Sequence, residues 1–208
     1  MQKIEITLYN FGELSENAKK KAIEDNRESI GVCDSEFVSD DYKCTFDAIE
    51  EKFGIKVRDL ESHGYARFRM TCGWQDIEDN PKFLLRYLDW LSSRIHKGKY
   101  YSTPMRRDDA GNWHYKHKYS KVLSEGYSYC LTGTYTDWAV DDAMNKRFEY
   151  VRKGYTIREF IDEMLDKFCQ LWDEDSNDCF SDEHVQEHLE NNECTFLKNG
   201  KVFLNVCA

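Results

Sequence analysis

The clearest structural signal in this chain lies at residues 156–172, which read TIREFIDEMLDKFCQLW. Thr156 and Glu159 have the spacing of a capping box, a pattern that begins a helix. Apolar residues then recur three or four positions apart, which places them on one helical face; they are Ile157, Ile161, Met164, Phe168 and Trp172. The stretch therefore predicts a long amphipathic helix whose apolar stripe is buried.

Further helices are predicted on both sides of this one from capping residues and apolar spacing. They cover residues 15–29, 40 or 41 to 53, 80–98, 136 or 137 to 151, and 181–191. The helix that ends at residue 151 is expected to bury Val140, Met144, Phe148 and Val151. Residues 31–39 lack such a stripe and are predicted to form a loop.

Alternation of apolar and polar residues predicts strands between the helices. The strands are expected at residues 3–9, 55–61, 65–72, 113–119 and 127–132. Residues 194–197 and 201–204 are joined by Asn199-Gly200, a dipeptide typical of tight hairpin turns. The chain is therefore expected to end in a β-hairpin.

This order of elements is not a regular β-α-β alternation, and it favours an α+β fold. We expect a mainly antiparallel sheet packed against several amphipathic helices. The prediction is a single domain over residues 1–208, with a candidate mobile insertion near residues 97–121.

Composition narrows the class of protein. Aromatic residues make up 14% of the 208 residues, which is too many for a disordered chain. No run of 18 apolar residues occurs, and the first residues lack the pattern of a secretory signal. We therefore expect a soluble, cytosolic protein with no membrane segment. Its eight cysteines include no Cys-x-x-Cys pair, and we expect reduced, mostly buried thiols.

Charge is distributed unevenly along the chain, whose net charge is −10. Residues 94–121 hold eight Lys or Arg against Asp108 and Asp109, a net charge of +6. Residues 159–193 hold thirteen Asp or Glu against Lys167, a net charge of −12. Both segments are candidate binding surfaces.

Three stretches resemble a known group of proteins. They are the opening strand with FGELSENAKKKAI at residues 11–23, the strand end LTG at residues 131–133 before an acidic helix, and the closing segment at residues 181–203. In these stretches the chain resembles uncharacterised bacteriophage and prophage accessory proteins, some of which are labelled antitoxins of a toxin–antitoxin stability system. The resemblance implies an accessory protein of a phage or mobile element that acts in the cytoplasm of a bacterial host, without an established activity.

The sequence contains no phosphate-binding glycine loop, nucleophile elbow or His-Glu-x-x-His motif. One metal-like pattern is present: Cys179, His184, His188 and Cys194, with the two histidines one helical turn apart. These cysteine spacings are not those of a usual zinc finger. We interpret the four as packing residues and predict no metal and no cofactor.

The basic stretch carries aromatic residues among its cations, as in surfaces that stack bases and bind phosphates. Its candidate contacts are Arg106, Arg107, Trp113, Lys116, Lys118 and Lys121. The other interpretation, which we favour because the whole chain is acidic, is a solvated hairpin. The acidic stretch offers Asp173, Glu174, Asp175 and Asp178, expected in a break between two helices, as a docking patch for a basic partner.

These observations favour a non-enzymatic inhibitor encoded by a phage or mobile element. It would use its acidic surface to block a bacterial host defence protein, such as a CRISPR effector or another basic nucleic-acid enzyme. Two alternatives remain: an antitoxin-like protein that neutralises a toxin, and a nucleic-acid-binding protein that uses residues 94–121.

Overall fold

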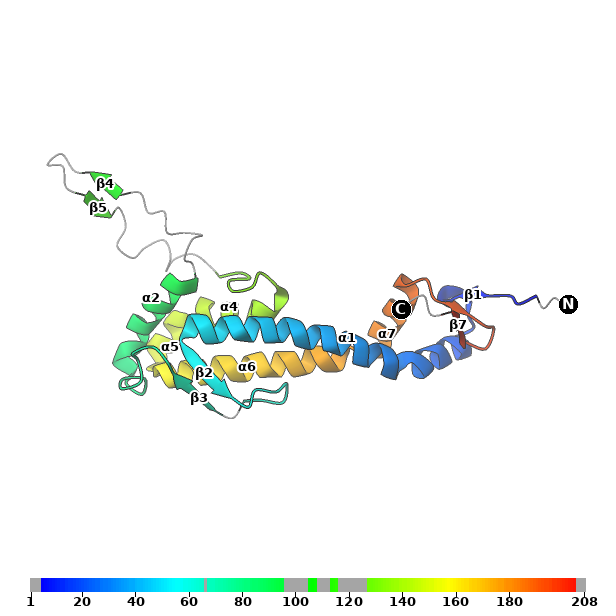
Figure 1. The fold of residues 1–208 in the computed structure, drawn as a ribbon, viewed down its shortest axis with the longest axis horizontal. Helices are drawn as coiled ribbons and strands as arrows, with labels where there is room; N and C mark the ends of the chain where they lie inside the picture. The colour runs from blue at the N-terminus through cyan, green and yellow to red at the C-terminus, as the bar shows by residue number, and fades with distance from the viewer. Residues whose placement is uncertain (1–4, 66, 96–104, 108–112, 116–126, 205–208) are drawn as a thin grey trace. The chain divides into compact units, whose positions relative to one another are not determined.

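The computed structural model describes residues 5–65, 67–95, 105–107, 113–115 and 127–204 (Figure 1). The chain forms two compact units. The smaller unit contains residues 1–40 and 173–208, and the larger unit contains residues 41–172. The single domain over residues 1–208 stays a prediction, because it concerns whether the whole chain folds cooperatively.

Helices account for most of the described residues. The α-helices are α1 (Glu16–Phe53), α2 (Leu84–Ile95), α4 (Trp138–Asn145), α5 (Arg147–Lys153), α6 (Ile157–Asp178) and α7 (Asp182–Asn191). Short 3-10 turns are η1 (Phe11–Glu13), η2 (Pro81–Phe83) and η3 (Tyr135–Asp137). None of the helices in the described part of the chain is both long and apolar enough to cross a membrane.

The strands are β1 (Tyr9–Asn10), β2 (Ile55–Arg58), β3 (Arg67–Met70), β4 (Met105–Arg107), β5 (Trp113–Tyr115), β6 (Thr195–Phe196) and β7 (Val202–Leu204). Every pair is antiparallel, and the strands form three small sheets in the orders β1-β6-β7, β2-β3 and β4-β5. The α+β class and the C-terminal hairpin, formed by β6 and β7, are confirmed.

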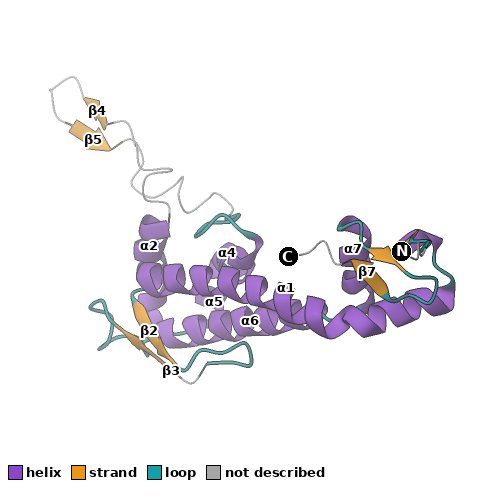
Figure 2. Cartoon of the chain, turned by 45° about the vertical axis from the view of Figure 1, so that its right-hand side comes forward, coloured by secondary structure: helices purple, strands orange, loops and turns teal. Residues whose placement is uncertain are grey.

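The core of the smaller unit lies where β1, β6 and α7 meet the first part of α1; Figure 2 shows β7 beside α7 in this unit. Its buried residues are Phe11, Leu14, Ala18, Ala22, Ile23, Ile30, Val185, Leu189, Cys194 and Phe196. The hairpin turn approaches α1 closely, because a Cβ on Gly200 would lie 2.1 Å from the Ala18 carbonyl oxygen. Gly200 also has a positive φ of 85°, which favours glycine.

The core of the larger unit is built on α6. All five residues of the predicted stripe, Ile157, Ile161, Met164, Phe168 and Trp172, are buried, which confirms the amphipathic helix. The capping box is also present, because the Thr156 N–H donates to Glu159 and the Glu159 N–H donates to the Thr156 hydroxyl. The C-terminal part of α1 packs on this helix through Tyr42 and Phe46, which contact the Phe168 ring.

The predicted loop at residues 31–39 is wrong, because α1 runs through it without interruption. Gly31 suggests a break, but its lack of a side chain has another cause: a Cβ there would lie 2.3 Å from the Phe180 ring. The Ser35 hydroxyl donates to the Val32 carbonyl at 3.0 Å, so this polar side chain has a hydrogen-bond partner within the helix.

The predicted strand at residues 127–132 is also wrong. The backbone N–H groups of this segment donate hydrogen bonds to side-chain oxygens and not to a neighbouring strand. Tyr127 donates to Asn145, Cys130 donates to Asp141, and residues 131–133 all donate to the buried Asp137 carboxylate. The three acceptors, Asp137, Asp141 and Asn145, are spaced four residues apart, so their side chains lie on the same side and face this segment. Their hydrogen bonds take the place of those that a neighbouring strand would form.

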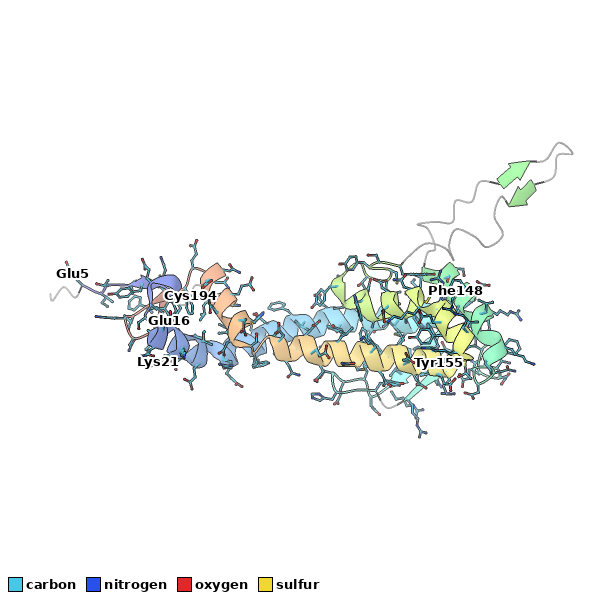
Figure 3. All side chains as sticks on the ribbon, turned by 180° about the vertical axis from the view of Figure 1, so that it is seen from behind. Glu5, Glu16, Lys21, Phe148, Tyr155 and Cys194 are labelled. Carbon is cyan, nitrogen blue, oxygen red and sulfur yellow. The ribbon has the colours of Figure 1, made fainter. Side chains whose placement is uncertain are left out.

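Other boundaries differ from the predictions. The helix predicted to end at residue 151 is divided at Lys146 into α4 and α5, and Phe148 is 46% exposed instead of buried (Figure 3). Among the described residues, the first predicted strand is reduced to Tyr9–Asn10. The insertion near residues 97–121 lies mostly outside the described residues, which include only β4 and β5 from it.

The helix α6 extends further than its stripe predicts. It ends at Asp178, so Asp173, Glu174, Asp175 and Asp178 belong to its last turns and not to a break between helices. No residue from Asp173 to Asp178 is buried, but the helix runs on to the buried Cys179, whose thiol donates to the Asp175 carbonyl at 3.4 Å.

Candidate functional site

The acidic segment, defined here as Asp173–Glu193, covers the end of α6 and all of α7. It contains nine carboxylates and no Lys or Arg. Of the four predicted contacts, Glu174 and Asp178 are exposed, whereas Asp173 and Asp175 are half-buried. Asp173, Glu174 and Asp175 each take part in an interaction within the protein. Glu174 and Asp178 are the most exposed of the four, and the docking patch stays a prediction.

Further exposed carboxylates continue along α7; they are Asp182, Glu183, Glu187 and Glu190. Only Asp182 among these has an ion pair with a described cation, the guanidinium of Arg27 on α1. The same guanidinium donates to the Phe180 carbonyl at 3.2 Å, which ties the α6–α7 connection to α1. Most of the negative charge on α7 is thus left facing solvent.

A second arrangement, the Asp–His cluster, consists of Asp34, His184 and His188. Helix α7 begins at Ser181, whose hydroxyl accepts from the His184 N–H at 3.1 Å. This cap sets the helix so that His184 and His188 lie one turn apart on one face. Asp34 approaches them from α1, and its Oδ2 lies 2.7 Å from His184 Nε2 and 3.0 Å from His188 Nδ1.

The structure separates the two cysteines of the predicted pattern from this cluster. Cys194 lies in the hydrophobic core of the smaller unit, beside the first turns of α1 that carry Glu16 and Lys21 (Figure 3). Cys179 is buried, and burial raises the pKa of its thiol, with a further contribution from the Asp34 charge. The two histidines are brought together as their spacing predicts, and the structure adds Asp34 to them.

Sequence reasoning missed Asp34 because nothing local marks it. It stands 150 residues from His184 and falls in a stretch predicted to be a loop. Only the continuity of α1 brings it opposite α7.

A third arrangement, the basic hairpin face, lies on β2 and β3. Lys56, Arg58, Arg67 and Arg69 are all exposed, and the strand register places Lys56 opposite Arg69 and Arg58 opposite Arg67. The alternate residues Ile55, Phe68 and Met70 are buried on the other face. Together with Phe68, the four cations line a shallow hollow of about 380 Å³.

Like charges directly opposite each other destabilise an antiparallel pair. Lys56 is compensated by an ion pair with Glu50. Arg58, Arg67 and Arg69 form no ion pair within the described part of the chain. An anion bound on this face would relieve the repulsion.

The predicted basic stretch is described only in part. Arg106 and Arg107 lie in β4, and Arg107 pairs with Trp113 of β5. Lys116, Lys118 and Lys121 lie outside the described residues, so a nucleic-acid interface at residues 94–121 stays a prediction.

Another hollow, of about 410 Å³, lies among α4, α5 and α6. Four of its charged and polar groups form two contacts with each other. Lys146 pairs with Asp142 at 2.8 Å, and the Tyr150 hydroxyl donates to Glu163 at 3.0 Å.

The seven described cysteines are all free, as predicted. Three of them, Cys169, Cys179 and Cys194, are buried, while Cys33 and Cys44 are exposed, so the prediction of mostly buried thiols is only partly confirmed. Cys44 was expected beside a core face. Cys44 lies two residues after the buried Tyr42, and residues two apart on a helix face different sides, so the Cys44 side chain is exposed.

No known protein family, curated protein or solved structure shows significant similarity to this chain.

Proposed function

We propose that this protein is a non-enzymatic binding protein that blocks a basic partner with its acidic segment. The observation that carries the proposal is the concentration of nine carboxylates, without Lys or Arg, in residues 173–193, which include the end of α6 and all of α7. The partner class that fits best is a nucleic-acid enzyme with a basic groove. With the resemblance to phage accessory proteins, this supports an inhibitor of a bacterial defence protein, such as a CRISPR effector nuclease.

The physics of such an inhibitor is phosphate mimicry. Exposed carboxylates such as Glu174 and Asp178 can accept charge-assisted hydrogen bonds from Arg and Lys of the partner. A concentrated negative field also steers a positively charged partner and speeds association, most strongly at low salt. An antitoxin would use the same contacts against a toxin, and rescue of growth from a cognate toxin distinguishes the two.

The test compares two variants with the same change in net charge, from −10 to −4. The first carries Glu174→Lys, Asp178→Lys and Glu187→Lys in the acidic segment. The matched control carries Glu24→Lys, Asp25→Lys and Glu28→Lys, which are exposed residues of α1 in the same unit. Partners captured from a host lysate with the wild-type protein are purified, and their association rates are measured at several salt concentrations.

We expect the acidic-segment variant to associate more slowly and with a weaker salt dependence, while the control retains most of the rate. Equal losses in both variants would mean that net charge, and not the acidic segment, drives binding. An unchanged rate in the acidic-segment variant would overturn the proposal.

The basic hairpin face supports a second candidate function, the binding of a nucleic acid. A two-stranded β-ribbon fits the DNA major groove, and exposed Arg side chains are the usual phosphate and base contacts. The uncompensated cations Arg58, Arg67 and Arg69 are the specific observation in its favour. If it is right, the triple Gln variant at these positions loses oligonucleotide binding in fluorescence anisotropy, while the acidic-segment variant keeps it.

A further inference from the structure

The Asp–His cluster brings three potential metal ligands to one point. His184 Nε2, His188 Nδ1 and one carboxylate oxygen of Asp34 lie within 4.8 Å of one another. All three side chains are half-buried, so the point they enclose is partly shielded and still reachable from solvent. They come from two helices of the same unit, α1 and α7.

The separations fit a small divalent cation. Zinc binds imidazole nitrogen and carboxylate oxygen at about 2.0–2.2 Å, so ligand atoms at tetrahedral corners stand roughly 3.3–3.5 Å apart. The measured separations from Asp34 Oδ2 are 2.7 Å to His184 and 3.0 Å to His188. A movement of well under 1 Å at each side chain would therefore open the site to the size of the ion.

The ligand types select among metals. Two imidazoles and one carboxylate suit zinc and other first-row transition metals, whereas magnesium and calcium prefer sites made only of oxygen. The two histidines are spaced i, i+4 on one helical face, as in established zinc sites on helices. The neighbouring carboxylates of α7, such as Glu183 and Glu187, add a negative field that favours a cation.

Without a metal ion, the same contacts are those of a hydrogen-bonded cluster. Asp34 Oδ2 can accept from both rings only if His184 carries its proton on Nε2 and His188 carries its proton on Nδ1, or if a ring is doubly protonated. Metal binding uses the opposite tautomers, in which the same two nitrogens present lone pairs and the Asp34 carboxylate presents its charge to the same centre.

We propose that Asp34, His184 and His188 form a binding site for one divalent transition-metal ion, preferentially zinc. The site joins α1 to α7 and so fixes the helix that carries four of the nine carboxylates of the acidic segment. Three protein ligands leave a fourth position for water or for a donor atom from a partner. The proposal does not depend on the proposed function, because it concerns metal binding by the isolated chain.

The experiment uses the full-length protein after removal of metal with a chelator. Zinc is titrated by calorimetry, and cobalt is used as a spectroscopic substitute. Single variants His184→Ala, His188→Ala and Asp34→Asn are compared with wild type. His63→Ala is the matched control, because His63 is an exposed histidine of the larger unit.

We expect one zinc ion per chain and a rise in melting temperature when zinc is added. Removal of either histidine should weaken binding about 100-fold or more, and Asp34→Asn about 10-fold or more, because each change removes a ligand. The control should bind as wild type does. Cobalt absorption of the wild type should indicate a four-coordinate site with nitrogen and oxygen ligands and no thiolate band.

Absence of a one-to-one zinc complex in the wild type would overturn the proposal, as would equal binding by all variants. A thiolate-to-cobalt band would also overturn it, since Cys179 would then replace a member of the ligand set. The wild-type spectrum decides these outcomes even if a histidine variant fails to fold.

Discussion

The indole of Trp172 stacks on the phenol ring of Tyr42, with ring centroids 5.7 Å apart and planes only 3° from parallel. Phe168 meets both rings edge-on, at 5.2 Å from Tyr42 and 6.4 Å from Trp172. All three side chains are buried in the larger unit. These three rings pack α6 against the last part of α1. Phe168 and Trp172 are the last two residues of the predicted apolar stripe.

Trp172→Ala should cost about 3–5 kcal/mol in the free energy of unfolding, because a large buried ring leaves a cavity. Such a loss is a large share of a total stability of roughly 5–15 kcal/mol. Phe168→Ala should cost a similar amount. The measurement is equilibrium unfolding in urea, with the midpoint compared at constant slope.

Trp172→Phe is the matched control for this prediction. The buried indole N–H has no hydrogen-bond partner among the described residues, so its removal costs no hydrogen bond. The remaining ring can still stack on Tyr42, and we expect a loss below about 1.5 kcal/mol. Equal losses for Phe and Ala would show that ring stacking contributes little at this position.

Gly31→Ala should destabilise the protein although alanine favours helices by about 1 kcal/mol over glycine. The reason is that the new Cβ would lie 2.3 Å from the Phe180 ring, and such overpacking costs typically about 1–3 kcal/mol. In a Phe180→Ala background the sign should reverse, because the clash is gone and the helix preference remains. Thermal melting of the four proteins in this double-mutant cycle measures the coupling. Additive effects would contradict the close packing of α1 against Phe180.

Asp89→Asn should stabilise the protein at neutral pH. Asp89 is half-buried, its Oδ1 has no hydrogen-bond partner among the described residues, and burial raises its pKa above the ordinary value of 3.8. An acid whose pKa is higher in the folded state than in the unfolded state destabilises the fold when it is ionised. The advantage of Asn is therefore complete above the raised pKa and disappears as the pH falls through it toward 3.8.

Melting temperatures measured from pH 7 down to acid conditions test this dependence on Asp89. Asp76→Asn, at an exposed position, is the control and should leave the melting temperature nearly unchanged at all pH values. A constant difference between Asp89→Asn and wild type across the range would show that burial of the charge is not its cause.

The sequence predicts the elements whose signals are local. The stripe of α6, the serine cap of α7 and the Asn199-Gly200 hairpin each depend on neighbouring residues, and each is found in the structure. The continuity of α1 through residues 31–39, by contrast, is not indicated by the neighbouring residues. Gly31 is indistinguishable in sequence from a helix-breaking glycine, and only the distant Phe180 ring explains it.

The same division applies to the predicted sites. The spacing of His184 and His188 is visible in the sequence, whereas Asp34 is joined to them only by the packing of α1 against α7. The acidic segment was found from composition, but the exposure of each carboxylate was not. A recognisable signal was overlooked at Asp137, Asp141 and Asn145, whose four-residue spacing places three acceptors on one face beside residues 127–133.

Arg67→Glu should raise the stability of the protein and abolish any anion binding by the basic hairpin face. Arg67 stands directly opposite Arg58 in the register of β2 and β3, so the wild type holds two like charges together. The substitution converts the pair into opposite charges, and such cross-strand pairs contribute roughly 0.2–1 kcal/mol. The Glu of Arg69→Glu would face Lys56, which already has Glu50 as a partner, so the gain in stability of this variant should be smaller.

Thermal melting measures the stability of these variants, and fluorescence anisotropy with a labelled oligonucleotide at low and moderate salt measures the binding. A residue whose removal stabilises the fold but eliminates binding is one retained for function. Loss of stability in Arg67→Glu would instead assign the guanidinium a structural role and remove the main support for a nucleic-acid partner.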